Sequence, residues 1–68
     1  MSPQQFVHLA VLDARPYFDA FGRQGLLCRE IVQEFVDEKL REAADRGIEN
    51  PSLKDDLTRH LLQEAGVQ

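Results

Sequence analysis

The chain has 68 residues, a mass of 7.8 kDa and a formal net charge of −4, from 12 acidic and 8 basic side chains. This length allows a single domain, residues 1–68. Apolar types make up 43% of the residues, too many for a disordered chain of such modest charge. A lone Cys excludes a disulfide scaffold, and no apolar run approaches the roughly 18 residues of a membrane span. The acidic balance argues against nucleic-acid binding, because surfaces that bind phosphates are basic.

The N-terminal stretch predicts a helix that is interrupted at Pro16. Ser2 and Gln5 have the spacing of a capping box, in which each side chain bonds the other residue's backbone N–H. The run Phe6 to Leu12 is apolar on more than one face, which indicates burial from several sides. Pro16 lacks an N–H and clashes with the carbonyl four residues back. We therefore expect a kink there, or a break followed by a short turn over 16–21.

The middle stretch, residues 26–46, predicts the longest helix of the chain. Apolar and polar pairs alternate along it with a period of four, and a strand with that pattern would bury half its charges. A loop over 22–25 precedes it. Gly47 suits the left-handed position just past the helix, and Ile48 can then fold back on Ala43 as in a Schellman cap.

The last stretch predicts a short helix, with Asn50 as its N-cap, Pro51 at its first position and Gly66 at its end. Its leucines recur every four residues on one ridge: Leu53, Leu57 and Leu61. The predicted fold class is therefore all-α, a small three-helix domain with a long central helix.

The period of four has a consequence for packing. Four residues overshoot a helical turn by about 40°, so the stripe on 26–46 winds through roughly 160° along a helix about 31 Å long. We expect the first helix to cover Cys28, Ile31 and Phe35. The third helix, or a second copy of the chain, would cover Val36 and Leu40. Because three short helices offer little cover, the sequence predicts a homodimer or an obligate partner.

An acidic ridge is the first candidate binding surface. Its members recur every four residues: Glu30, Glu34, Glu38 and Glu42. Like charges at this spacing destabilise an isolated helix by a few tenths of a kcal/mol per pair. Two pairs of opposite charge are expected to relieve part of the repulsion: Asp37–Arg41 and Glu42–Arg46. Two interpretations stay open, a surface for a basic partner and the solvated face of an ordinary acidic protein.

An aromatic cluster beside Pro16 is the second candidate. It consists of Tyr17, Phe18 and Phe21, flanked by Arg15 and Arg23, and Tyr and Arg are typical of interface hot spots. The alternative is that the rings cap the core where the first two helices meet. Both interpretations hold if Phe18 or Phe21 points inward and Tyr17 outward.

The histidines and the cysteine form no pattern typical of a cofactor site, a metal site or an active site, so we expect no cofactor, no bound metal and no enzymatic activity. His8, Cys28 and His60 are far apart, whereas zinc ligands cluster in closely spaced pairs. We expect Cys28 to be a plain buried thiol. The sequence contains no nucleophile motif and no phosphate-binding loop.

A fragment of the chain also resembles the DNA-binding helix-turn-helix. Ala43, Gly47 and Leu53 match positions of that motif, but its second helix would then begin with Asp55 and Asp56 facing phosphates. A DNA-binding regulator is therefore the rival hypothesis, and nucleic acid is an unfavourable partner.

The sequence thus favours a small cytoplasmic protein that binds and occludes another protein, as an inhibitor, adaptor or antitoxin-like factor. The lone Cys and the lack of a signal peptide favour the cytoplasm. The aromatic cluster would supply affinity and the acidic ridge would steer a basic partner. Small acidic helical proteins of phage and mobile elements are similar in build, which is an analogy only. A structural subunit of a larger assembly is a further alternative.

Overall fold

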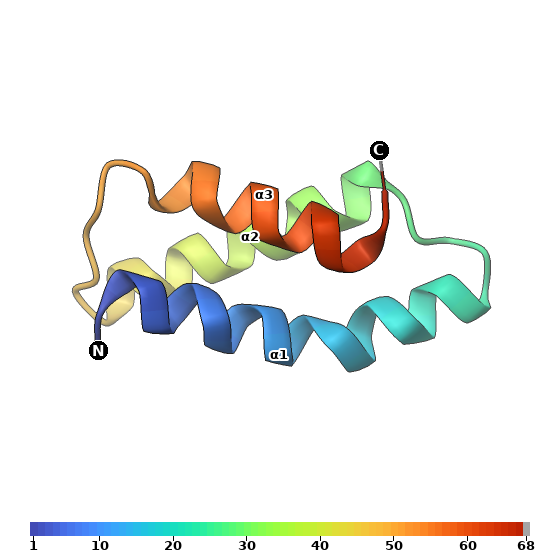
Figure 1. Cartoon of the computed structure of the whole chain (residues 1–68), viewed down its shortest axis with the longest axis horizontal. Helices are drawn as coiled ribbons and strands as arrows, with labels where there is room; N and C mark the ends of the chain where they lie inside the picture. The colour runs from blue at the N-terminus through green and yellow to red at the C-terminus, as the bar shows by residue number, and fades with distance from the viewer. Residues whose placement is uncertain (68) are drawn as a thin grey trace.

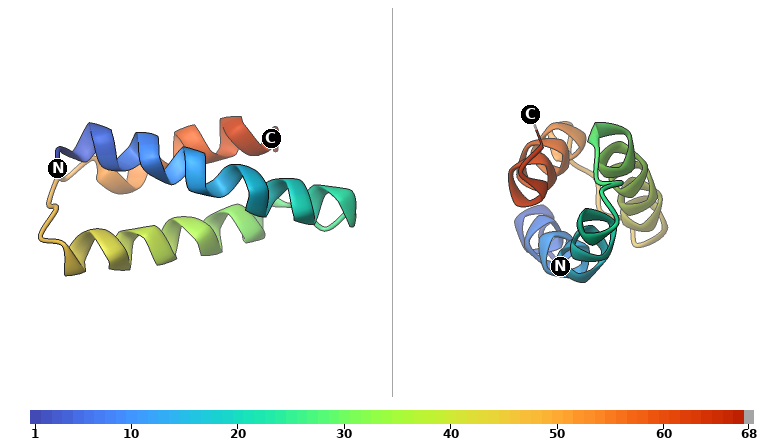
Figure 2. Two further views of the ribbon diagram at one scale, coloured as in Figure 1. Left: turned by 90° about the horizontal axis from the view of Figure 1, so that it is seen from below. Right: turned by 90° about the vertical axis from the view of Figure 1, so that its right-hand side faces the viewer.

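Three helices follow one another in the computed structural model, which describes residues 1–67: α1 (Pro3–Arg23), α2 (Arg29–Asp45) and α3 (Leu53–Ala65). Consecutive helices run in opposite directions, and the end-on view places the three at the corners of a triangle (Figures 1 and 2). No strand occurs within residues 1–67. The predicted all-α, three-helix fold is confirmed.

The helix α1 is continuous through Pro16, so of the two predicted alternatives the break is wrong, and the kink stays a prediction. Its start agrees with the sequence, because Ser2 and Gln5 form both capping-box hydrogen bonds, each at 3.1 Å. Pro16 lies on the exposed side of the helix, while Ala14 and Phe18 on either side of it in the chain are buried. The proline removes one backbone hydrogen bond, and the buried contacts around it keep the helix together.

The helix α2 begins later than predicted, and α1 rather than α2 is the longest helix, with 21 residues against 17. Gly25 ends α1 in a left-handed conformation with φ +71°, and the Leu26 N–H donates to the Phe21 carbonyl at 2.9 Å. The chain is then extended up to Cys28, the N-cap of α2. Residues 26–28, which the period of four assigned to the helix, therefore belong to the linker between α1 and α2.

The connection from α2 to α3 contains two local motifs. Gly47 has φ +73°, and the Ile48 N–H donates to the Ala43 carbonyl at 2.9 Å, which confirms the predicted Schellman cap. The Asn50 side chain accepts from the Ser52 N–H at 2.8 Å and from its hydroxyl at 2.7 Å. Asn50 thus caps a turn, and α3 begins immediately after Ser52, slightly later than predicted.

The core is organised around α3, which packs closely against both other helices, while α1 and α2 approach each other closely at only a few positions. The predicted leucine ridge of α3 is buried: Leu53, Leu57 and Leu61. Between α1 and α2, the rings of Phe18 and Phe35 meet edge to face with centroids 5.4 Å apart. The leucines of α3 and the aromatic rings between α1 and α2 together fill the interior.

The apolar stripe of α2 is covered within the chain. Of the two predicted alternatives for its cover, the third helix and a second copy, the structure shows the third helix. Val32, Phe35 and Val36 are buried, Leu40 is half-buried, and no large apolar side chain of α2 is exposed. The stripe is covered mainly by α3, which packs closely along α2, and by rings of α1 such as Phe18. The exposed large apolar side chains lie elsewhere, chiefly on α1.

We expect Leu57→Ala to lower the free energy of unfolding by about 2–5 kcal/mol, because Leu57 is 0% exposed and its removal leaves a cavity at the centre of the core. Urea denaturation followed by circular dichroism measures the change. Lys54→Ala, at an exposed position of the same helix, should change stability by less than about 0.5 kcal/mol. Equal effects of the two substitutions would show that α3 is not the centre of the core.

We expect Pro16→Ala to raise the free energy of unfolding by about 1–3 kcal/mol, because a proline inside a helix is about 3 kcal/mol less favourable than alanine. Pro16 is exposed, so the substitution removes no buried contact. The same urea titration tests this, and an unchanged or lower stability would mean that Pro16 makes a favourable contribution that burial does not reveal.

Candidate interaction surfaces

Three carboxylates of the predicted ridge form one exposed surface of α2. Glu30, Glu34 and Glu38 are exposed, and within residues 1–67 none of them takes part in an ion pair. We call these three residues the acidic face. The pKa of Glu30 is lowered by a hydrogen bond to its own backbone N–H, then by the Cys28 side chain and the charge of Arg29, against a small opposing effect of burial. Its carboxylate therefore stays ionised, as suits the start of a helix.

Glu42 is separated from the acidic face by its contacts. It is half-buried and pairs with Lys39 at 3.1 Å and with Arg46 at 3.0 Å, so the predicted Glu42–Arg46 pair is confirmed. Because the ridge winds around α2, its last member reaches the side of the helix that faces α1. The four glutamates predicted as one surface thus have two different environments.

Lys39 joins α1 to α2 beneath this end of the ridge. Its side chain is 12% exposed, and its Nζ lies 3.0 Å from Asp13 of α1 and 3.1 Å from Glu42. The same nitrogen lies 5.3 Å from the centre of the Phe35 ring. Burial lowers the pKa of Lys39, but the hydrogen bonds and charges of the two carboxylates together raise it above its ordinary value of 10.5.

The other predicted pair, Asp37–Arg41, is not formed among the described residues. The Gln33 side-chain amide donates instead to the Asp37 carboxylate at 3.2 Å. Arg41 is exposed on the outward side of α2 and pairs with no residue between 1 and 67. It neutralises part of the negative charge on that side without engaging any one carboxylate.

The aromatic cluster is divided between core and surface. Phe18 is buried, Phe21 is half-buried and Tyr17 is 39% exposed. The Tyr17 ring centroid lies 4.9 Å from that of Phe21 and 5.3 Å from that of Phe35 in α2. The rings therefore close the α1–α2 contact, and Tyr17 is the one large side chain of the cluster that also presents surface.

Arg15, predicted to act with these rings, points to a different helix. Its Nε lies 2.6 Å from a carboxylate oxygen of Glu64 in α3. The Asp13–Lys39 pair therefore marks the α2 side of α1, and the Arg15–Glu64 pair marks its α3 side. The sequence placed Arg15 with Tyr17 by proximity along the chain, whereas the helix turns the two side chains apart.

A further apolar surface was not among the predicted sites. Leu9 is 42% exposed and Leu12 is 40% exposed, both on the side of α1 away from the core. The width of the apolar run Phe6 to Leu12 was the signal that could have found it. A helix that is apolar on two sides buries one side in a three-helix bundle and leaves the other in solvent.

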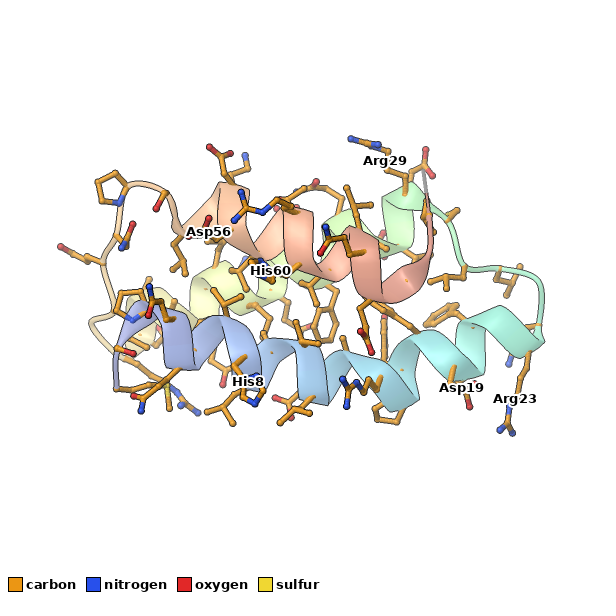
Figure 3. All side chains as sticks on the ribbon, in the orientation of Figure 1. His8, Asp19, Arg23, Arg29, Asp56 and His60 are labelled. Atoms are coloured by element: carbon orange, nitrogen blue, oxygen red, sulfur yellow. The ribbon has the colours of Figure 1, made fainter. Side chains whose placement is uncertain are left out.

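The remaining polar side chains do not converge on a site. Figure 3 shows His8 on α1 and His60 on α3, and a ring nitrogen of His60 lies 2.7 Å from the Asp56 carbonyl oxygen. Cys28 is half-buried rather than fully buried. Within the described part of the chain, no three His, Cys, Asp or Glu side chains are placed to hold a metal ion.

The fragment that resembles a helix-turn-helix does not adopt that arrangement. The motif joins two helices at about 90–120° through a turn of about 3–4 residues. Here α2 and α3 lie side by side in opposite directions, joined by residues 46–52 (Figure 1). Ile48 and Leu53 are buried in the core, and Asp55 and Asp56 occupy the first turn of α3.

No family model, no curated protein and no solved structure matches this chain. None of the helices within residues 1–67 combines the length and the apolar character that crossing a membrane requires. Inferences about binding must therefore come from the surfaces described above.

We expect the stability advantage of the wild type over Lys39→Met to be present below pH 10.5 and to shrink as the pH rises through the raised pKa of Lys39. Deprotonation removes the cation that Asp13 and Glu42 stabilise in the folded state, whereas Met does not titrate. Urea titrations of both proteins at about pH 8 and about pH 12 measure the difference. Lys54→Met, at an exposed position, should show no such trend, and an advantage that persists at high pH would contradict the expectation.

Proposed function

We propose that this protein binds a basic partner protein through the acidic face of α2 and acts by occluding that partner's basic surface. The observation that carries the proposal is the row of three exposed, unpaired carboxylates, Glu30, Glu34 and Glu38, within residues 1–67. Carboxylates nearer the other helices are paired, as Glu42 and Glu64 are. Four other carboxylates within residues 1–67 also lack an ion pair, but Glu30, Glu34 and Glu38 are the unpaired ones that recur every four residues along one helix.

The spacing of the acidic face supports a role in binding. Glutamates four residues apart repel each other, by a few tenths of a kcal/mol per pair in an isolated helix. A basic partner would relieve this repulsion on binding and would be attracted from a distance. Complementary charge chiefly raises the association rate and rejects wrong partners.

Tyr17 is the proposed apolar contact beside the acidic face. Its ring centroid lies 5.3 Å from that of Phe35, a buried residue of the helix that carries the acidic face. Tyrosine supplies a large contact area with a polar tip, which is why it is common in binding interfaces. Phe18 and Phe21 would act through Tyr17, by holding its ring in place.

The proposal is tested by capturing partners from the native host's lysate with the immobilised protein and then measuring association with the purified partner. We expect Glu34→Lys combined with Glu38→Lys to slow association by about 10-fold or more at low salt, because these charges steer the encounter. Added salt should reduce the difference between the two proteins. Circular dichroism should show an unchanged helix content, since both positions are exposed.

A matched control separates the acidic face from the net charge of the protein. Glu49→Lys combined with Asp55→Lys changes the net charge by the same amount at exposed positions outside α2. This control should retain more of the wild-type association rate than the α2 double variant. Equal association rates of the two double variants would refute a role for the acidic face, and loss of the partner's activity in the complex would support occlusion.

A further inference from the structure

We infer that the outer face of α1 pairs with α1 of a second copy of this chain, in an antiparallel, two-fold symmetric contact. The outer face is an uncharged strip of exposed residues: Gln5, Leu9, Leu12 and Pro16. This inference does not depend on the proposed function, because the acidic face lies on a different helix.

The four charged side chains of α1 are all paired within residues 1–67: Asp19 pairs with Arg23 of the same helix at 3.0 Å, and the other two engage neighbouring helices. Asp13 pairs with Lys39 of α2, and Arg15 pairs with Glu64 of α3. These two ion pairs mark opposite sides of α1, and the outer face lies between them. Leu9 and Leu12 are therefore flanked by charges that are already engaged, at 42% and 40% exposure.

The intervals between the residues of the outer face have the same order in both chain directions. Its residues are four, three and four positions apart, which is the alternation of the seam in a two-stranded coiled coil. In an antiparallel pair centred between Leu9 and Leu12, Leu9 of one copy lies level with Leu12 of the other. Gln5 then lies level with Pro16 of the second copy. A two-fold interface requires this kind of self-complementary surface.

The charges of α1 also favour this pairing. One layer beyond Pro16, Asp19 lies level with Ser2 of the second copy, where the positive end of the helix dipole favours a carboxylate. Within its own helix, Asp19 pairs with Arg23 at 3.0 Å. The four charged residues of α1 balance, Asp13 and Asp19 against Arg15 and Arg23, so the whole net charge of −4 lies outside this helix. Two copies therefore meet through their least charged helices, and their acidic faces stay outside the contact.

The size of the contact predicts weak association. A helix of 21 residues is about 31 Å long, and one helix pair buries less than the roughly 1,600 Å² of a standard interface. We therefore expect a dissociation constant of about 10 µM to 1 mM, so that monomer and dimer exchange.

Sedimentation equilibrium of the full chain under reducing conditions, from about 10 µM to about 1 mM, tests the association. The apparent mass should rise from 7.8 kDa toward twice that value. Leu9→Ser combined with Leu12→Ser should weaken the association by about 10-fold or more, because both exposed apolar side chains are lost. Glu34→Gln combined with Glu38→Gln, on α2, should not weaken it. A mass of 7.8 kDa at every concentration, or association that survives the double serine variant, would overturn the inference.

Disulfide trapping tests the register. In a Cys28→Ala background, Leu9→Cys and Leu12→Cys proteins are mixed and oxidised, and the variants should fold because both positions are exposed. The antiparallel pairing predicts that the mixed Leu9→Cys/Leu12→Cys dimer outnumbers the two same-site dimers together. A predominance of same-site dimers would indicate parallel pairing and overturn the proposed contact. Association through the outer face can fail while partner binding through α2 persists, so the two proposals are tested separately.

Discussion

The burial of the α3 leucine ridge is the interaction on which the structure depends. Leu57 and Leu61 are 0% exposed, and α3 packs closely against both other helices, which meet each other closely at only a few positions. The wider space between α1 and α2 is filled by large rings and by the stem and ammonium of Lys39. A chain of this size has a small core, so few side chains account for most of its stability.

The division of charge follows from this packing. The ion pairs Asp13–Lys39 and Arg15–Glu64 join α1 to its two neighbours, and partly exposed pairs of this kind contribute little individually. Their main consequence is that they mark the side of α1 that faces α2 and the side that faces α3. One side of α2 keeps unpaired carboxylates, and one side of α1 keeps leucines without charge. The two surfaces have opposite chemistry, which is why they fit different proposed occupants, a basic protein and a second copy of this chain.

Much of the fold could be predicted because its signals are local. The capping box at Ser2, the Schellman cap at Gly47 and the leucines of α3 are each encoded within a few residues and agree with the structure. The errors concern Pro16 and the start of α2, where a local rule competes with tertiary packing. Of the candidate surfaces, the acidic ridge was visible in advance from its spacing. The exposure of Leu9 and Leu12 was not, since an apolar run does not indicate which of its sides will be covered.

By itself, therefore, the sequence determined that the chain forms three helices, where α1 begins, how α2 and α3 end, and that α2 carries a row of carboxylates. These properties depend on hydrogen bonds and periodicities within single segments. Only the tertiary structure decided that α1 continues through Pro16, that α3 and α1 cover the apolar stripe of α2, and that, among residues 1–67, Glu42 is paired whereas Glu38 is not. Those outcomes depend on which helix lies beside which, because the contacts between helices select among conformations and exposures that each segment alone would permit.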